Sequence, residues 1–282
     1  MELKRPDPVF GGFLSLTVEG NAERQHFTLL SDGGYIVRFD MDAAWRIGAR
    51  QFAELPGGPS TGWEKRDRDS ESMIVDPATG DLSIGFEYAN AIWRYDHQLK
   101  VVRRHAAPPA MHSWHENGGP EAFVRLPDGA TIVFAETVLP KLRRTLQRAP
   151  GRIAIRFSGD STVEPNSRFG FVYLPPENYD PSDATLLPDG RILVLNRRFA
   201  LSFNFTAKLT IIDPKAIRPG ARVKGEEIAP FTAPLLHDNF EGLVVLQEGP
   251  DTVIWMVSDD NQLFLQRSLL LKFRLDRNVL RR

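Results

Sequence analysis

The sequence predicts an all-β fold, a single β-propeller domain of five blades with about four strands each, over residues 1–282. Three observations support this prediction. Short runs rich in Val, Ile, Leu, Phe, Tyr and Trp are separated by Pro, Gly and Asp from end to end, which is typical of many short strands. A pair of such runs recurs every 50 to 62 residues, a period typical of propeller blades. A length of 282 residues also suits one all-β domain.

The repeat is a pair of apolar segments joined by a turn of Pro, Asp and Gly. An acid and a small residue open the first segment, and a polar residue ends the second. Four stretches follow this plan: residues 70–87, 120–136, 182–197 and 240–260. A fifth stretch, 14–32, has Ser in place of the acid. The aligned positions are Ser15, Glu71, Glu121, Asp183 and Glu241.

Each repeat continues into further strand-like segments, which would complete a blade. They are 35–40 and 45–51, then 91–96 and 100–106, then 152–157 and 169–174, then 208–213 and 225–231. The last repeat has only 269–276, so we expect residues 1–5 to supply its outer strand, which would close the ring and remove an open edge.

One segment, 139–150, has helical periodicity, with Leu139, Leu142 and Leu146 spaced by three and four residues. We expect a surface insertion whose basic residues face solvent, or alternatively form a lip that recruits phosphate. Those residues are Lys141, Arg143, Arg144 and Arg148. A sixth, degenerate blade hidden near residues 137–150 is the alternative to five blades.

Composition excludes several classes of function. Lys and Arg total 35 and Asp and Glu 36, a net charge of −1, so neither nucleic acid nor an anionic membrane is expected as a partner. The chain has no Cys, which excludes disulfides, thiolate metal sites and a cysteine nucleophile. No apolar run approaches the roughly 20 residues of a membrane span. The chain as given shows no signal peptide.

The repeated acids carry the prediction of a site. The first strand of a propeller blade lies nearest the axis, so Glu71, Glu121, Asp183 and Glu241 would converge at the mouth of a central channel. Like charges at close range raise each other's pKa, so a positive partner is expected there. A hard divalent cation such as Ca²⁺ takes 6 to 8 oxygen ligands. Further oxygens would come from Asp259, Asp260, Asn239 and Asn261.

Two other interpretations of these acids stay open. Arg197 follows a second strand where other repeats have Glu87 and Glu136, so it could neutralise part of the ring through bidentate pairs. The acids could also accept backbone hydrogen bonds from neighbouring blades. If the mouth is catalytic, Glu87 or Glu136 would accept a proton. The substrate would be bound by Arg197 and Arg198, which would hold an anionic group, and by Asn239 and Asn261.

Other motifs give weaker signals. His112 and His115 are three residues apart in a polar loop, which is compatible with Zn²⁺, but no third ligand has a recognisable spacing. No G-x-S-x-G elbow, P-loop or G-x-G-x-x-G is present. The five Trp residues are expected to pack between blades, with Trp63 and Trp114 as alternatives for stacking on a ligand.

Several segments resemble the phytase-like propeller family, described as having esterase-like activity. DNFEGL (238–243), VSDDN (257–261) and QRSLLLKFRL (266–275) resemble its carboxy-terminal signature. NGGPEAFVRLPDG (117–129) and PSDATLLPDGRILVLNR (181–197) resemble its middle repeats, and FGGFLSL (10–16) its first. The chain departs from the family's GGLSG at Leu16, which replaces a Gly and alters the first rim loop.

The resemblance implies a propeller with hydrolytic activity on phosphate or other esters, of a kind that bacteria often export. A periplasmic or secreted location is therefore expected, with a cytoplasmic one left open. The leading hypothesis is a monomeric, Ca²⁺-dependent hydrolase of a small anionic or ester substrate. The alternatives are a propeller that binds a ligand or protein without catalysis, and a sugar-lactone hydrolase.

Overall fold

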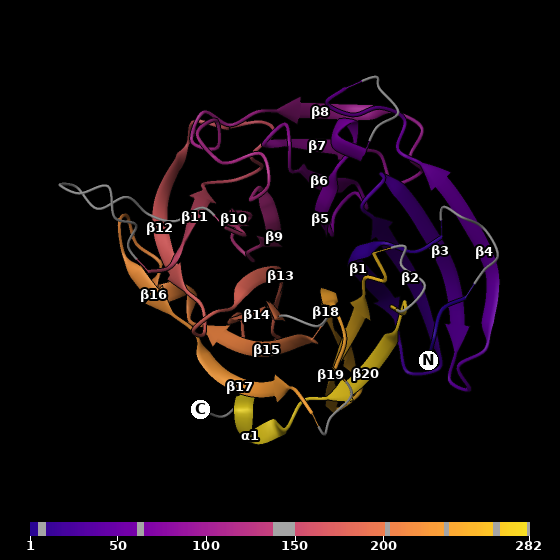
Figure 1. Cartoon of the computed structure of the whole chain (residues 1–282). Helices are drawn as coiled ribbons and strands as arrows, with labels where there is room; N and C mark the ends of the chain where they lie inside the picture. Colours follow the sequence, from indigo (N-terminus) through magenta and orange to yellow (C-terminus); the bar gives the residue numbers. More distant parts are fainter. Residues whose placement is uncertain are drawn as a thin grey trace.

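Five β-sheets follow one another in chain order around a central axis in the computed structural model of the protein (Figure 1). The structure describes residues 1–4, 10–60, 65–137, 150–200, 204–233, 237–261 and 266–280. Each sheet is one blade, so the predicted five-bladed, all-β propeller is confirmed. The predicted helix at 139–150 and the proposed degenerate blade near 137–150 fall almost entirely outside the described residues.

The blades have the following strands. Blade 1 contains β1 (Phe13–Gly20), β2 (Arg24–Ser31), β3 (Tyr35–Asp42) and β4 (Ile47–Glu54). Blade 2 contains β5 (Ser70–Val75), β6 (Leu82–Phe86), β7 (Ala91–Tyr95) and β8 (Val102–Ala106). Blade 3 contains β9 (Pro120–Arg125), β10 (Thr131–Ala135), β11 (Arg152–Phe157) and β12 (Arg168–Leu174). Blade 4 contains β13 (Asp180–Leu186), β14 (Ile192–Ala200), β15 (Asn204–Ile212) and β17 (Glu226–Phe231). Blade 5 contains β18 (Phe240–Glu248), β19 (Asp251–Ser258) and β20 (Leu270–Arg274).

The described helices are short and peripheral. They are two one-turn 3₁₀ helices, Lys65–Asp67 and Pro214–Ala216, and α1 (Arg277–Leu280). No helix in the described part of the chain has the length and apolarity needed to cross a membrane.

One strand leaves its own blade. β16 (Arg222–Lys224) lies in the connection between β15 and β17 of blade 4, yet it pairs in parallel with β12 at the outer edge of blade 3. The backbone N–H of Val172 donates to Ala221 O at 2.8 Å, which extends this pairing. β16 therefore covers an edge of blade 3 and ties it to blade 4.

The inner strands form a continuous ring. β1 contacts β5, β5 contacts β9, β9 contacts β13, β13 contacts β18, and β18 contacts β1. At the outer side of blade 5, an antiparallel bridge joins Glu2 to Leu269, and Leu3 N donates to Ser268 O at 2.8 Å. In the described residues this is a single bridge and not a full fourth strand.

The hydrophobic core is divided into five clusters, one in each seam between neighbouring blades. Blades 5 and 1 share Phe27 and Trp255, whose rings meet edge to face at 4.9 Å between centroids. Blades 1 and 2 share a cluster that includes Leu30 and Phe86. Strands buried on both faces have nearly continuous apolar sequences, as β10 does. Trp114 is buried between blades 2 and 3, which confirms the packing role expected for it.

Candidate functional site

A β-bulge at the start of the inner strand recurs in every blade. In blade 2, Ser70 pairs with Phe86 and Ser72 with Gly85, so Glu71 is left between them without a partner. A bulged residue leaves the strict alternation of a strand, and bulges re-aim side chains at functional edges. The equivalent residues in blades 1 to 5 are Leu14, Glu71, Glu121, Ser182 and Glu241.

This register corrects the alignment of Asp183 with the three glutamates, which is off by one residue because Ser182 is the bulged residue of blade 4. The Asp183 side chain is 2% exposed and accepts hydrogen bonds from the backbone N–H groups of Leu243 and Ala184, both at 2.8 Å. Ser15 Oγ donates to it at 3.4 Å. Asp183 thus joins blade 4 to blades 5 and 1, which is the structural alternative considered above for these acids.

A second set of polar residues comes directly after the second strand of each blade, except in blade 4, where the residue lies within β14. Its members in blades 1 to 5 are Asp32, Glu87, Glu136, Arg197 and Asp259. A recurring backbone hydrogen bond helps to position them. Glu87 N donates to Asp69 O at 2.8 Å, and Asp259 N to Asn239 O at 2.8 Å. In blade 3, the partner is Gly119, where a Cβ atom would lie 2.7 Å from the Glu87 Cα atom, so only glycine fits.

These two sets surround a cavity of about 290 Å³. Residues from all five blades line it, which places it on the propeller axis. They are Leu14, Arg66, Asp69, Glu71, Glu87, Tyr88, Asn117, Glu121, Glu136, Arg197, Glu241, Asp259 and Asn261. Seven of these side chains are carboxylates and two are guanidiniums. The structure therefore brings the predicted Glu71, Glu121, Glu241 and Asp259 together.

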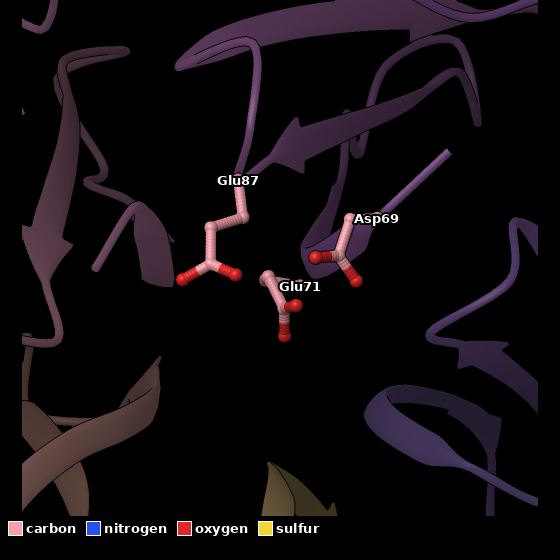
Figure 2. Close-up of side chains that lie close together, drawn as sticks. All are labelled: Asp69, Glu71 and Glu87. Carbon is pink, nitrogen blue, oxygen red and sulfur yellow. The ribbon is translucent and has the colours of Figure 1, made fainter. Parts of the chain in front are cut away.

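Two groups of carboxylates in this cavity have the spacing of a cation site. One is Asp69, Glu71 and Glu87, whose side chains lie close together in Figure 2, and the other is Glu87, Glu121 and Glu136. Within each group, one oxygen from every residue lies within 4.8 Å of the others. Two oxygens bound to one Ca²⁺ at roughly 2.3–2.6 Å are at most about 5 Å apart, so both groups fit this cation.

Asp69 was missed from the sequence. It stands two residues before the bulged Glu71, as Asn239 stands two residues before the bulged Glu241. The shared spacing was a signal that could have identified it.

A guanidinium and an amide also contact acids of the cavity. Arg197 pairs with Glu136 at 2.6 Å and with Glu241 at 3.2 Å. The side-chain amide of Asn239 donates to Glu241 Oε1 at 2.7 Å and to Asp259 Oδ2 at 3.2 Å. Arg197 and Asn239 therefore contact acids contributed by blades 3 and 5.

Burial and crowding shift the pKa of these groups. Burial raises the pKa of Glu87 to about 8, reinforced by the charge of Asp69 and opposed by a hydrogen bond from Gly119 N at 3.3 Å. Burial also raises the pKa of Glu121 and Glu136. For Asp259, burial and then Glu241 raise the pKa to about 8. Near neutral pH these channel acids therefore retain protons or take up cations.

Arg197 stays charged in this setting. Burial disfavours its charge, but Glu241 and Glu136 raise its pKa above the ordinary value. Its guanidinium is thus engaged with the channel acids, as in the neutralising role considered for it, and the substrate-binding role stays a prediction.

Three further predicted site residues lie away from the cation groups. Arg198 is exposed and does not line the cavity. Asp260 accepts hydrogen bonds from Gly12 N at 3.0 Å and Ser268 Oγ at 2.7 Å, and lines a different cavity beside residues 2–4. Asn239 is fully buried and acts through the acids that it contacts.

The histidine pair is not part of a metal group in the described residues. His112 Nε2 lies 2.9 Å from Ala107 O, and His115 Nδ1 accepts from Asn117 N at 3.2 Å. These local contacts are those of loop histidines.

The fold and the cavity define a class of protein, the five-bladed propellers with a carboxylate-rich axial site. The chain belongs to the Phytase-like family, whose model, described as "Esterase-like activity of phytase", matches residues 8–262. No curated protein matches the sequence significantly.

Solved structures resemble the chain at low identity. An α-L-arabinofuranosidase from Podospora anserina, solved with cellotriose, is 12% identical, covers 96% of this chain and 94% of its own, and has a TM-score of 0.56. A GH43 β-1,3-galactosidase solved with galactodeoxynojirimycin is 9% identical, with 80% and 79% covered and a TM-score of 0.48. The Kuenenia stuttgartiensis hydrazine synthase is 12% identical over 99% of this chain, with a TM-score of 0.43, and this chain spans only 66% of its length. The arabinofuranosidase supports the propeller fold alone.

Proposed function

We propose that the protein is a cation-dependent hydrolase that cleaves an ester or phosphoester at the mouth of its central channel. One observation carries the proposal: the two carboxylate groups, Asp69, Glu71, Glu87 and Glu87, Glu121, Glu136, meet at a shared Glu87 in an axial cavity. Membership of the family named for esterase-like activity supports the reaction class. Ca²⁺ is the proposed cation, because every donor is a hard oxygen.

A bound cation would polarise the phosphoryl or carbonyl oxygen and lower the pKa of a coordinated water. The protein's own side chains would orient and exchange protons. Glu136 Oε1 accepts from Arg197 Nη2 at 2.6 Å, which fixes the carboxylate. Its second oxygen, Oε2, would take the proton. Glu136 is therefore the proposed proton acceptor, and Glu87, shared by both groups, is the proposed cation ligand. Arg66 and Tyr88 line the cavity where an anionic ester would enter.

The first test is metal analysis paired with a hydrolase screen. We expect the purified protein to hold Ca²⁺, to lose activity on a phosphate monoester or carboxylic ester in EDTA, and to regain it with Ca²⁺. Glu87→Gln removes a ligand from both groups, so it should lower Ca²⁺ content more than Glu136→Gln. Both should reduce kcat by about 10²-fold or more.

Glu227→Gln is the matched control. Glu227 on β17 pairs with Lys208 on β15, and neither residue lines the channel cavity. Its Ca²⁺ content and activity should equal those of the natural protein. Retention of full activity in EDTA, with no metal in the purified protein, would contradict the proposal. Ca²⁺ binding without turnover on phosphate, carboxylic-ester and lactone substrates would instead support a propeller that binds a ligand without catalysis.

A further inference from the structure

A basic residue occupies the same place on the third strand of four blades. The register of each sheet defines this place: Thr28 pairs with Arg38, Ser83 with Arg94, Ile132 with Arg156, and Trp255 with Lys272. The four places are equivalent because each is counted from the bulge. The residue just before the bulge pairs with a residue of the second strand, and the partner of the basic residue lies three positions before that residue. Blade 4 has Ile211 at this place.

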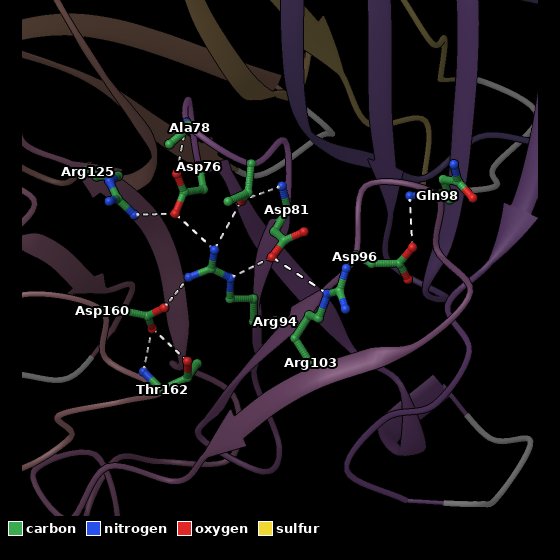
Figure 3. Close-up of polar contacts among 11 residues, drawn as sticks. Asp76, Ala78, Asp81, Arg94, Asp96, Gln98, Arg103, Arg125, Asp160 and Thr162 are labelled. Atoms are coloured by element: carbon green, nitrogen blue, oxygen red, sulfur yellow. Dashed lines mark hydrogen bonds and ion pairs between the residues drawn. The ribbon is translucent and has the colours of Figure 1, made fainter.

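Three of the four basic residues are paired with acids at or beside the turn between the first two strands. Arg94 pairs with Asp76 at 2.9 Å and with Asp160 of blade 3 at 2.6 Å, in the network shown in Figure 3. Arg156 pairs with Asp128 at 2.5 Å. Lys272 pairs with Glu248 at 2.8 Å and lies over the Trp255 ring.

Arg38 differs from these equivalents. Among the described residues, no carboxylate lies within 4.0 Å of its guanidinium and no hydrogen-bond partner is present. Asp40, two residues along β3, is engaged by Arg24 and by His26. Glu19 is exposed and beyond ion-pair distance, although it lines the same cavity as Arg38, and the charges of Glu19 and Asp96 act on Arg38 only at longer range. Burial lowers the pKa of Arg38, but an arginine remains charged at neutral pH.

The Arg38 side chain faces a cavity of about 310 Å³ in the seam between blades 1 and 2. Thr17, Thr28 and Arg38 are paired across three adjacent strands, so their side chains emerge on the same face of the sheet. The two threonine hydroxyls make no hydrogen bond to any described side chain or backbone group. His97, from the loop after β7, lines the same cavity.

We propose that Arg38, Thr17 and Thr28 form a binding site for a small oxyanion of the phosphate class. A guanidinium presents a planar set of N–H donors that matches two oxygens of such an anion, and the hydroxyls supply further donors. The volume is at the lower end of the roughly 300–1,000 Å³ typical of small-molecule pockets, which favours a phosphate or phosphate monoester. The site lies toward the ends of the inner strands remote from the channel carboxylates, and is independent of the cation proposed there.

Titration calorimetry of the full chain in EDTA tests this site, with inorganic phosphate and glycerol phosphate as separate probes. We expect saturable binding of phosphate, lost or weakened about tenfold or more in Arg38→Gln. Arg156→Gln is the matched control, because Arg156 occupies the equivalent place in blade 3 but has an acid partner, and its phosphate affinity should be unchanged. Tighter binding of the monoester than of phosphate would identify a phosphorylated molecule as the ligand.

Thr28→Val keeps the side-chain shape and removes the hydroxyl, so it tests the site even if Arg38→Gln does not fold. It should weaken phosphate binding severalfold. The proposal would be overturned if the natural protein showed no saturable phosphate binding. It would also be overturned if the Arg38 and Thr28 variants bound phosphate as tightly as the natural protein.

Discussion

The identity of the bulged residue decides what each blade contributes to the channel. Glu71, Glu121 and Glu241 are aimed at the axis, whereas Leu14 and Ser182 bring no charge there. The residue that follows the bulge points into the ring of inner strands, and in blade 4 it is an acid. The bulged residue thus faces the channel, whereas the residue after it makes contacts that hold neighbouring blades together.

Asp183→Ala tests this separation. The substitution leaves the N–H of Leu243 without its acceptor, and that group is buried, so we expect a loss of about 1–3 kcal/mol in free energy of unfolding. Urea denaturation measures the loss, and metal analysis of the same preparation should show unchanged Ca²⁺ content. A stable variant that had lost its cation would show instead that Asp183 belongs to the channel site.

At the scale of elements, most strands could be predicted because apolar segments and Pro, Asp and Gly turns mark both ends of each hairpin. The bulge could not be placed in blades 1 and 4, where the residue before Ser15 and the residue before Asp183 are not acids. The short β16 has no periodic pattern of its own, and its pairing with blade 3 depends on tertiary contacts. Asp69, by contrast, could have been predicted, because it stands two residues before Glu71 as Asn239 stands two residues before Glu241.

The seam between blades 2 and 3 depends on Arg94, whose guanidinium joins three aspartates and is only 16% exposed. Removing one partner of a buried ion pair leaves the other charges uncompensated. Arg94→Met should therefore lower the free energy of unfolding by about 2 kcal/mol or more, a value reduced for the remaining contact with solvent.

Arg103→Met is the control for that experiment. Arg103 approaches Asp81 only to 3.9 Å and is 52% exposed, so its loss should change stability by less than about 1 kcal/mol. Equal effects of the two substitutions in urea denaturation would show that the Arg94 network does not hold the seam.

For the whole molecule, the ring brings together acids that are as far apart in sequence as Asp69 and Asp259, and its stability must respond to their ionisation. In the folded protein, burial raises the pKa of Glu87 and of Asp259 to about 8, from ordinary values of 4.5 and 3.8. The folded state therefore binds more protons than the unfolded state between about pH 4 and pH 8. The free energy of unfolding should fall as pH rises through this window.

Thermal unfolding in EDTA and in Ca²⁺, at pH 5 and pH 8, measures this dependence. In EDTA, we expect a lower Tm at pH 8 than at pH 5, because the carboxylates then lose their protons and repel one another. Glu87→Gln cannot ionise at this position, so it should show a smaller decrease than the natural protein. Ca²⁺ should raise the Tm of the natural protein by a few degrees or more at pH 8 and less at pH 5, because protons compete with the cation for the same oxygens. A Tm that is independent of pH in EDTA, or a Ca²⁺ effect that is equal in Glu87→Gln, would mean that the channel acids do not couple proton and cation binding to the stability of the ring.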